Sequence, residues 1–325
     1  MIRIPAITFT TLLLITHVVT ARDFTKPTSI ALRTEISYVT EATLIEKKHL
    51  EAKKWQLKFN MVSEIHNTSP EVLNILVKAD LAHSLAINFN YIIAYQTHQK
   101  TKVNGLVEYH LLANGPTLMK VEGANPAIFR SNQQLKKQFL IDPKLAQNDP
   151  KKLINTIMAG MKAKDPKIQE FFVRELINWV GLPDHLTDTD HQQLLALFNS
   201  TESSVGTLVA LLENRTALHQ AMGIEKMSSK VLSLLRVLPT QMEADSGLPA
   251  MVLQALNFSQ EHAIGDWHIY SRWIRSNIPS ITEKALLALH AINTDKTIDL
   301  VKDRNKETHL SDSSRRVLTR YLMNK

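Results

Sequence analysis

The spacing of apolar residues changes once along the chain, near residue 125, from every second position to every third or fourth. Before that point apolar and β-prone residues alternate with polar ones, first on even numbers from Ile30 to Tyr38 and later on odd numbers. The odd-numbered set is Trp55, Leu57, Phe59, Met61, Ile75, Val77, Leu85, Ile87, Phe89, Tyr91, Ile93, Tyr95, Val103, Val107, Tyr109 and Leu111. A period of two places such residues on one face of a strand. Turn residues at 67–70, 99–102 and 114–116 separate the runs, so we predict an antiparallel meander of about five or six strands.

The opposite face of this sheet is predicted to be polar. It carries Lys54, Gln56, Lys58, Asn60, Glu64, Asn88 and Asn90. One face therefore meets water, and the apolar face needs a cover. A helix or a second sheet is the ordinary cover, and a hydrophobic ligand is the alternative.

Beyond Asn125-Pro126 the spacing is helical. Asp149-Pro150 and Asp165-Pro166 are typical helix starts, because the carboxylate accepts from the first free amides and proline needs no donor there. Apolar stripes follow both starts, and Gly181 ends the second helix. Similar residues at the starts and ends of apolar stripes predict helices over 190–199, 204–222, 228–238, 249–260, 266–276, 280–292, 295–304 and 312–323. No strand is expected in this part of the chain.

Alternate helix starts recur at intervals of about 40 residues, which is the period of two-helix solenoid units. The segment Ile278 to Leu289 (IPSITEKALLAL), followed by Asn293-Thr294-Asp295 and by Ser311 to Leu318 (SDSSRRVL), resembles HEAT-type repeats. The resemblance covers about 143–325 and is clearest at 278–322. It implies a HEAT-like α-solenoid, and an irregular helical domain without superhelical stacking is the alternative. The predicted fold class is α+β, an N-terminal antiparallel β-meander followed by an all-α HEAT-like helical solenoid.

The first residues have the features of a secretory signal peptide. Arg3 gives a positive start, Ile7 to Val19 is apolar, and small residues precede Arg22. The apolar run is too short for a spanning helix, so we predict cleavage after Ala21 and a secreted or periplasmic product that is not transmembrane. An uncleaved anchor or a buried N-terminal helix is the alternative.

These patterns divide the chain into four parts. They are a signal peptide over 1–21, a β-rich domain over 22–125, a linker over 126–148 and an α-helical repeat domain over 149–325.

Composition excludes several kinds of chemistry. The chain has no cysteine, which rules out disulfide scaffolds, thiolate metal sites and a cysteine nucleophile. The formal net charge is +7, and basic residues outnumber acidic ones in 130–175 and 302–325. For an exported protein, anionic lipid headgroups, acidic polysaccharide or an acidic protein are better candidates than nucleic acid, which we do not expect as a partner. A basic surface that is merely solvated is the alternative.

Two clusters of titratable residues are candidate sites. The first combines His185, Asp188 and His191 with their neighbours Asp184 and Asp190, and imidazole with carboxylate oxygens can bind a divalent metal. Its alternative is that Asp188 or Asp190 caps the helix that begins near His191. The second cluster comprises Glu261, His262, Asp266, Trp267, His268, Tyr270 and Trp273. It can be an acid-base site, or a helix start capped by Asp266 whose aromatic side chains pack into the core.

No catalytic motif, phosphate-binding glycine loop or cofactor-binding segment is recognisable, so we expect neither an enzyme nor a cofactor. The solenoid resemblance implies an extended concave surface that binds a partner protein. The favoured function is therefore an exported, non-enzymatic interaction or scaffold protein. A sheet followed by a helical horseshoe also resembles, in architecture, the N-terminal portion of lipid-transfer proteins of the vitellogenin type. That resemblance implies the alternative, a protein that binds or transfers lipid or another apolar ligand; a metal-dependent enzyme is the third hypothesis.

Overall fold

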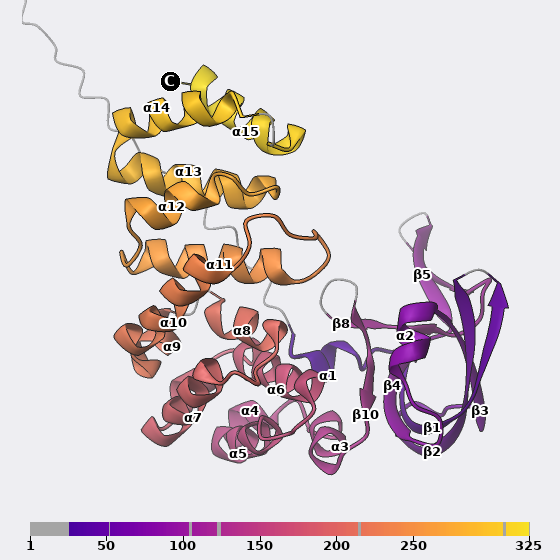
Figure 1. Cartoon of the computed structure of the whole chain (residues 1–325). Helices are drawn as coiled ribbons and strands as arrows, with labels where there is room; N and C mark the ends of the chain where they lie inside the picture. The colour runs from indigo at the N-terminus through magenta and orange to yellow at the C-terminus, as the bar shows by residue number, and fades with distance from the viewer. Residues whose placement is uncertain are drawn as a thin grey trace, which may run out of the picture.

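The structure, a computed structural model, describes residues 26–51, 53–103, 106–121, 125–213, 216–307 and 310–324. An antiparallel sheet occupies the first part of the chain and a helical region follows it, which confirms the predicted α+β class (Figure 1). The predicted signal peptide over 1–21 lies outside the described residues.

The main sheet is antiparallel and has the strand order β10-β4-β1-β2-β3, with β7 paired to β4. Its strands are β1 (Ser37–Glu51), β2 (Lys54–His66), β3 (Val72–Lys78), β4 (Asn90–Gln96), β7 (Thr117–Leu118) and β10 (Ile128–Arg130). The predicted meander holds for β1 to β3. It fails at β4, which pairs with β1 instead of β3. Strands β7 and β10 in turn pair with β4, so these three strands lie on the side of β1 opposite to β2. Two further pairs are β5 (His98–Val103) with β6 (Leu106–Leu111), and β8 (Lys120–Val121) with β9 (Asn125–Pro126).

The concave side of the main sheet encloses a small core of its own, which we call the inner core. It contains Ala42, Leu44, Leu57, Phe59, Leu73, Ile75, Ala82, Leu85, Tyr91, Ile93, Tyr95 and Ile128. The helix α2 (Ala79–Ser84) covers this side, and the ammonium of Lys47 donates to the carbonyl oxygens of Ala82 and Leu85 at 2.8 and 2.7 Å. Protein side chains therefore fill the apolar face of the sheet.

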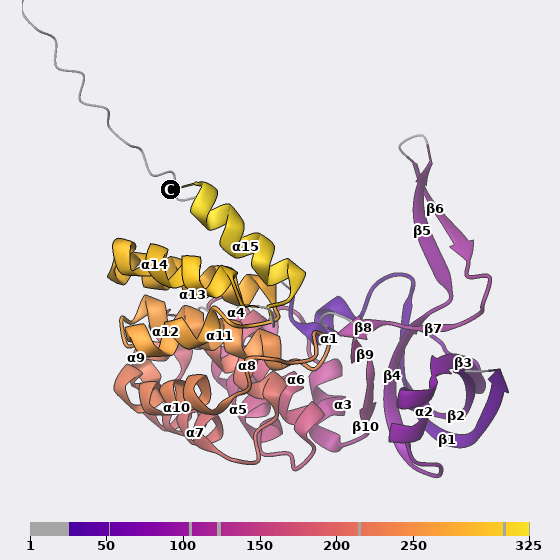
Figure 2. The same ribbon diagram turned by 45° about the horizontal axis from the view of Figure 1, so that its top comes forward.

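Strand β4 is buried on both faces. Tyr91, Ile93 and Tyr95 point into the inner core, whereas Ile92 and Ala94 belong to a second, larger core shared with the helices. That larger core also takes Phe129 from β10, whose ring lies 5.2 Å from that of Phe171. The sheet is thus packed directly against the helical region (Figure 2).

The helices begin where the sequence supplies caps. The Asp149 carboxylate accepts from the amide of Lys152 at 3.0 Å, and that of Asp165 accepts from the amide of Lys167 at 2.9 Å, as predicted. The elements of this region are α3 (Gln133–Phe139), α4 (Leu145–Asn148), α5 (Pro150–Gly160), α6 (Pro166–Asn178), the 3-10 turn η1 (Leu182–His185), α7 (Asp188–Asn199), α8 (Val205–Leu212), α9 (Thr216–Met222), α10 (Ile224–Val237), α11 (Leu248–Glu261), α12 (Trp267–Trp273), α13 (Pro279–Ile292), α14 (Thr294–Asn305) and α15 (Asp312–Met323).

Most of these helices form a stack. Helices α6, α8, α11, α13 and α15 contact one another in that order. On this column pack α5, α7, α10, α12 and α14, each against a neighbouring member (Figure 1). Such stacking buries each apolar stripe on the next unit. The identification of these units as HEAT-type repeats remains a prediction.

Several local predictions were wrong. Leu85, Ile87 and Phe89, expected on a strand, lie between α2 and β4 outside any strand. Thr28–Ala31 is the short helix α1 and not part of a strand, because a segment of this length carries too few apolar positions to distinguish the two periods. The segment 99–102, expected as a turn, lies within β5. The predicted single helix 204–222 is divided into α8 and α9.

Residues 126–148, which we expected to be a linker, contain β10, α3 and α4. Ala127, Ile128, Phe129, Leu135, Phe139 and Ile141 are buried, and the Phe139 ring lies 5.5 Å from that of Phe171. The segment therefore joins the sheet to the helices by packing. The domain boundaries that we assigned remain a prediction.

Candidate functional site

The first predicted cluster, around His185, Asp188 and His191, forms a helix start. Thr187 is the N-cap of α7, and the Asp190 carboxylate accepts from the Thr187 amide at 2.9 Å, so the two residues form a capping box. The predicted cap at Asp188 or Asp190 is thus replaced by Thr187, with Asp190 in the reciprocal role. His185 and Asp188 are exposed. These residues do not form a metal-like cluster among the described part of the chain.

The second predicted cluster is split by the fold. Asp266 caps α12 by accepting from the Ile269 amide at 2.9 Å, as its simpler interpretation required. Tyr270 and Trp273 are buried, and the Trp273 indole donates to the carbonyl of Leu235 at 3.0 Å. These residues therefore stabilise the stack, and only Glu261 and His262 remain as candidates.

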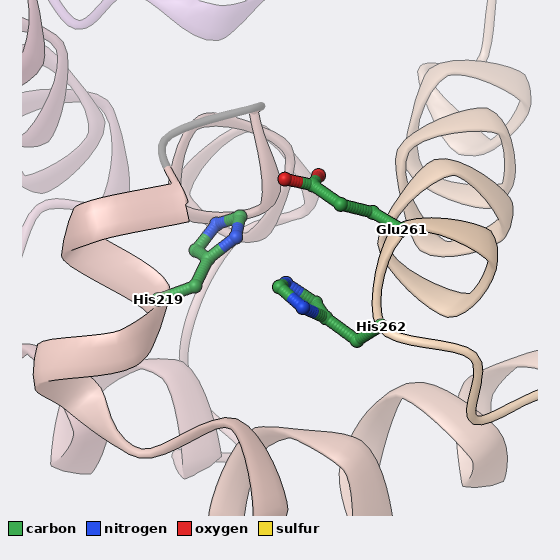
Figure 3. A group of neighbouring side chains, drawn as sticks. All are labelled: His219, Glu261 and His262. Atoms are coloured by element: carbon green, nitrogen blue, oxygen red, sulfur yellow. The ribbon is translucent and has the colours of Figure 1, made fainter.

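Glu261 and His262 meet a histidine that the sequence analysis did not select. His219 is on α9, Glu261 is the last residue of α11, and His262 caps that helix. Each offers one potential ligand atom, and the three atoms lie within 4.8 Å of one another. Figure 3 shows the three side chains pointing toward a common centre.

The hydrogen bonds of this cluster leave two imidazole nitrogens free. The His219 Nε2–H donates to the carbonyl oxygen of Leu211 at 3.0 Å, which leaves Nδ1 as the lone-pair nitrogen. His219 is fully buried, and neither its Nδ1 nor the buried Nε2 of His262 has a hydrogen-bond partner among the described residues. Glu261 is exposed, and its Oε1 accepts from the Thr216 hydroxyl.

The surroundings keep His219 neutral. Burial lowers the pKa of His219 below its ordinary value, and the nearby His262 acts in the same direction. The hydrogen bond to Leu211 and the charge of Glu261 oppose this effect without reversing it. The ring of Phe258 packs against both imidazoles, with centroid distances of 5.0 Å to His219 and 4.5 Å to His262. A neutral imidazole is the form that binds a metal ion.

The sequence contained one signal that would have found His219. It lies between Leu218 and Met222, which are both buried, within a helix that we predicted. A histidine on such an apolar face needs a partner for each ring nitrogen. What the sequence did not show is that α9 lies beside the end of α11.

A different surface feature is the hairpin of β5 and β6, which projects from the sheet (Figure 2). Every residue of β6 is exposed, and Leu106 and Leu111 are 71% and 76% exposed. Val107 and Tyr109, at 43% and 42%, lie between them. The Tyr109 hydroxyl donates to the carboxylate of Glu35, in the turn before β1, at 3.1 Å.

Comparison of the chain with protein-family models, curated proteins and solved structures finds no match. Within the described residues, no helix combines the length and the apolar content needed to cross a bilayer.

Proposed function

We propose that this protein is an exported, non-enzymatic interaction protein that binds a partner protein through the hairpin of β5 and β6. The observation that supports this function is the exposure of apolar side chains on both faces of β6, Val107, Tyr109 and Leu111 on one face and Leu106 on the other. Neighbouring exposed apolar side chains are a feature of interaction sites, whereas single ones are ordinary on a protein surface. An isolated two-stranded hairpin is also only marginally stable in water, so contact with a partner would stabilise it.

The hairpin also indicates the chemistry of its partner. Lys100 is exposed and lies opposite Tyr109, with its ammonium 5.9 Å from the ring centroid. The chain as a whole carries a formal charge of +7. A complementary partner therefore presents apolar side chains with acidic residues around them. The outer edges of β5 and β6 carry no paired strand among the described residues, so an extended segment of the partner can add to either.

The helical stack is the second element of the proposal. If its units are HEAT-like, the stack provides an extended surface for the same partner or for another one. Its exposed apolar residues are far apart in the sequence, with Val180 in the turn after α6, Val237 at the end of α10 and Leu287 within α13. For this reason we place the partner-binding site on the hairpin and not on the stack.

A photo-crosslinking experiment tests this function. The full chain carries a photoreactive amino acid at position 107 or, as a control, at position 180, and is exposed to the secreted or periplasmic fraction of its source. We expect one protein to form an adduct from position 107 and none from position 180. That protein, once purified, should bind Leu106→Ser/Leu111→Ser at least about tenfold more weakly than the wild type, and Val180→Ser/Val237→Ser as tightly.

Two outcomes would overturn the proposal. One is equal binding of the purified protein to the hairpin variant and to the wild type. The other is hairpin-dependent binding to vesicles of phosphatidylcholine and phosphatidylglycerol, which would identify a lipid surface as the target.

The lipid-carrier alternative has less support. It was based on the apolar face of the sheet, which is filled by the inner core and covered by α2. The cavity where β10 meets α6, lined by Phe129, Phe171 and their neighbours, has a volume of about 160 Å³, below the several hundred cubic ångströms of typical ligand pockets. A larger hollow of about 530 Å³ lies on the surface of α15, away from the sheet. Mass spectrometry of an organic extract of the natively produced protein checks this alternative directly.

A further inference from the structure

We propose that His219, Glu261 and His262 bind a zinc ion, which links α9 to the end of α11. Two imidazoles and one carboxylate are a known zinc-binding combination. The proposal does not depend on the function of the hairpin.

His219 is oriented as a ligand. Its Nε2–H donates to the Leu211 carbonyl at 3.0 Å, so Nδ1 presents its lone pair toward the other two side chains. Metal-bound histidines characteristically donate their second nitrogen to a carbonyl or carboxylate in this way. Because His219 is fully buried, the unpaired Nδ1 has lost its water without gaining a protein donor. A buried polar atom of this kind calls for an explanation.

His262 provides the second unpaired nitrogen. Its Nε2 is buried without a partner, although the residue as a whole is only half-buried. In the tautomer that carries its proton on Nδ1, His262 presents the lone pair of Nε2, and one cation would then satisfy this nitrogen and Nδ1 of His219 together. Both rings pack against Phe258, which lies 5.0 Å from the His219 ring and 4.5 Å from the His262 ring.

Glu261 supplies the negative charge. The Thr216 hydroxyl donates to its Oε1, so the carboxylate is held next to α9 while its other oxygen is available. The ligand atoms lie within 4.8 Å of one another, and tetrahedral zinc requires roughly 3.3 Å between ligands. Small side-chain rotations close this difference. Because Glu261 is exposed, the fourth position of the ion faces solvent and takes a water molecule.

The donor set selects zinc over the hard cations. Calcium and magnesium require mainly oxygen ligands, whereas imidazole suits zinc and its neighbours in the first transition row. The ion would connect α9 with α11. We therefore expect it to stabilise the folded chain.

The experiment uses the full chain without an affinity tag, freed of metal by a chelator. We expect one equivalent of Zn²⁺ by calorimetry, an increase in Tm, and a visible absorption band of low-symmetry Co²⁺ when cobalt replaces zinc. His262→Gln and Glu261→Gln test the ligands at the accessible side of the cluster. We expect His262→Gln to lose at least about 100-fold in zinc affinity and Glu261→Gln about tenfold, while both keep the circular dichroism spectrum of the metal-free wild type.

The matched controls are His268→Ala, an exposed histidine on the neighbouring helix, and the double variant His185→Ala/His191→Ala. Both should bind zinc as the wild type does. Absence of stoichiometric zinc binding, or equal affinity of the wild type and His262→Gln, overturns the proposal. Loss of binding in the double variant would place the site at the start of α7 instead.

Discussion

The amide and the hydroxyl of Ser29 both donate to the carboxylate of Glu175, each at 2.6 Å. Ser29 lies in α1, ahead of the sheet, and Glu175 lies in α6. The Gln138 amide donates to the same carboxylate at 2.6 Å and the Trp179 indole at 3.4 Å. One fully buried acid thus joins the beginning of the described chain to the helices that support the sheet.

This arrangement predicts a pH-dependent stability. Burial raises the pKa of Glu175, and its hydrogen bonds to Ser29, Gln138 and Trp179 only partly oppose that effect. The folded state therefore favours the protonated acid. The contribution to the free energy of unfolding is complete below the unfolded pKa of about 4.3 and is lost as the pH rises through the native pKa. In urea titrations across this range, the wild type should lose stability relative to Glu175→Gln as the pH increases; a relative gain would refute the prediction.

Glu41 should show the opposite dependence. Burial tends to raise the pKa of Glu41, but hydrogen bonds from Lys136 at 2.6 Å, Ser131 at 2.5 Å and Ser63 at 3.0 Å lower it overall. Its stabilising contribution is present above the unfolded pKa and is lost as the pH falls through the lower native pKa. Relative to Glu41→Gln, the wild type should therefore lose stability on acidification. For each acid, the measured quantity is the difference in the free energy of unfolding between the wild type and the glutamine variant. If this difference changed in the same direction with pH for Glu41 and for Glu175, the assignment would be contradicted.

The contact between α5 and α6 depends on Gly160. A Cβ atom at this position would lie 2.3 Å from ring carbons of Phe172, which is fully buried. Gly160→Ala should therefore destabilise the protein by about 1–3 kcal/mol, although alanine favours a helix. Chemical denaturation measures this change.

A double-mutant cycle distinguishes a steric clash from a general effect on the helix. Phe172→Leu removes the ring atoms that the new methyl group would meet. Phe172→Leu should lower the free energy of unfolding less in the Gly160→Ala background than in the wild type. Strictly additive costs would show that the methyl group does not contact the ring.

Export is tested at the predicted cleavage site. When the full chain is produced in a host with a secretory pathway, intact mass spectrometry of the exported product should give an N-terminus at Arg22. Leu13→Arg interrupts the apolar stretch and should retain the chain inside the cell. An exported product that still contains residues 1–21 would exclude cleavage at this position.

Local features were predicted well because their physical cause lies within a few residues. The caps at Asp149, Asp165 and Asp266 depend on one side chain and the next two or three amides, and all three are present. The start of the chain was more difficult. Ile30 and Leu32 fit an alternating pattern, yet Thr28–Ala31 is helical, because two apolar positions do not define a period.

Long-range features were not predictable in the same way. The pairing of β4 with β1 depends on contacts between distant segments, and alternation reports only which face is apolar. Of the three residues of the candidate site, the sequence indicated Glu261 and His262 but not His219. Its third member became apparent only when the helical stack placed α9 beside α11.

The burial of β4 on both faces has a consequence for the integrity of the whole chain. If the sheet were separated from the helices, Ile92 and Ala94 would be exposed on one part and Phe171 on the other. Neither fragment could remain soluble without covering these surfaces again. Heating should therefore unfold the sheet and the adjoining helices in one cooperative transition. Cleavage of the chain between residues 131 and 133 should yield two fragments that aggregate instead of two domains that fold independently.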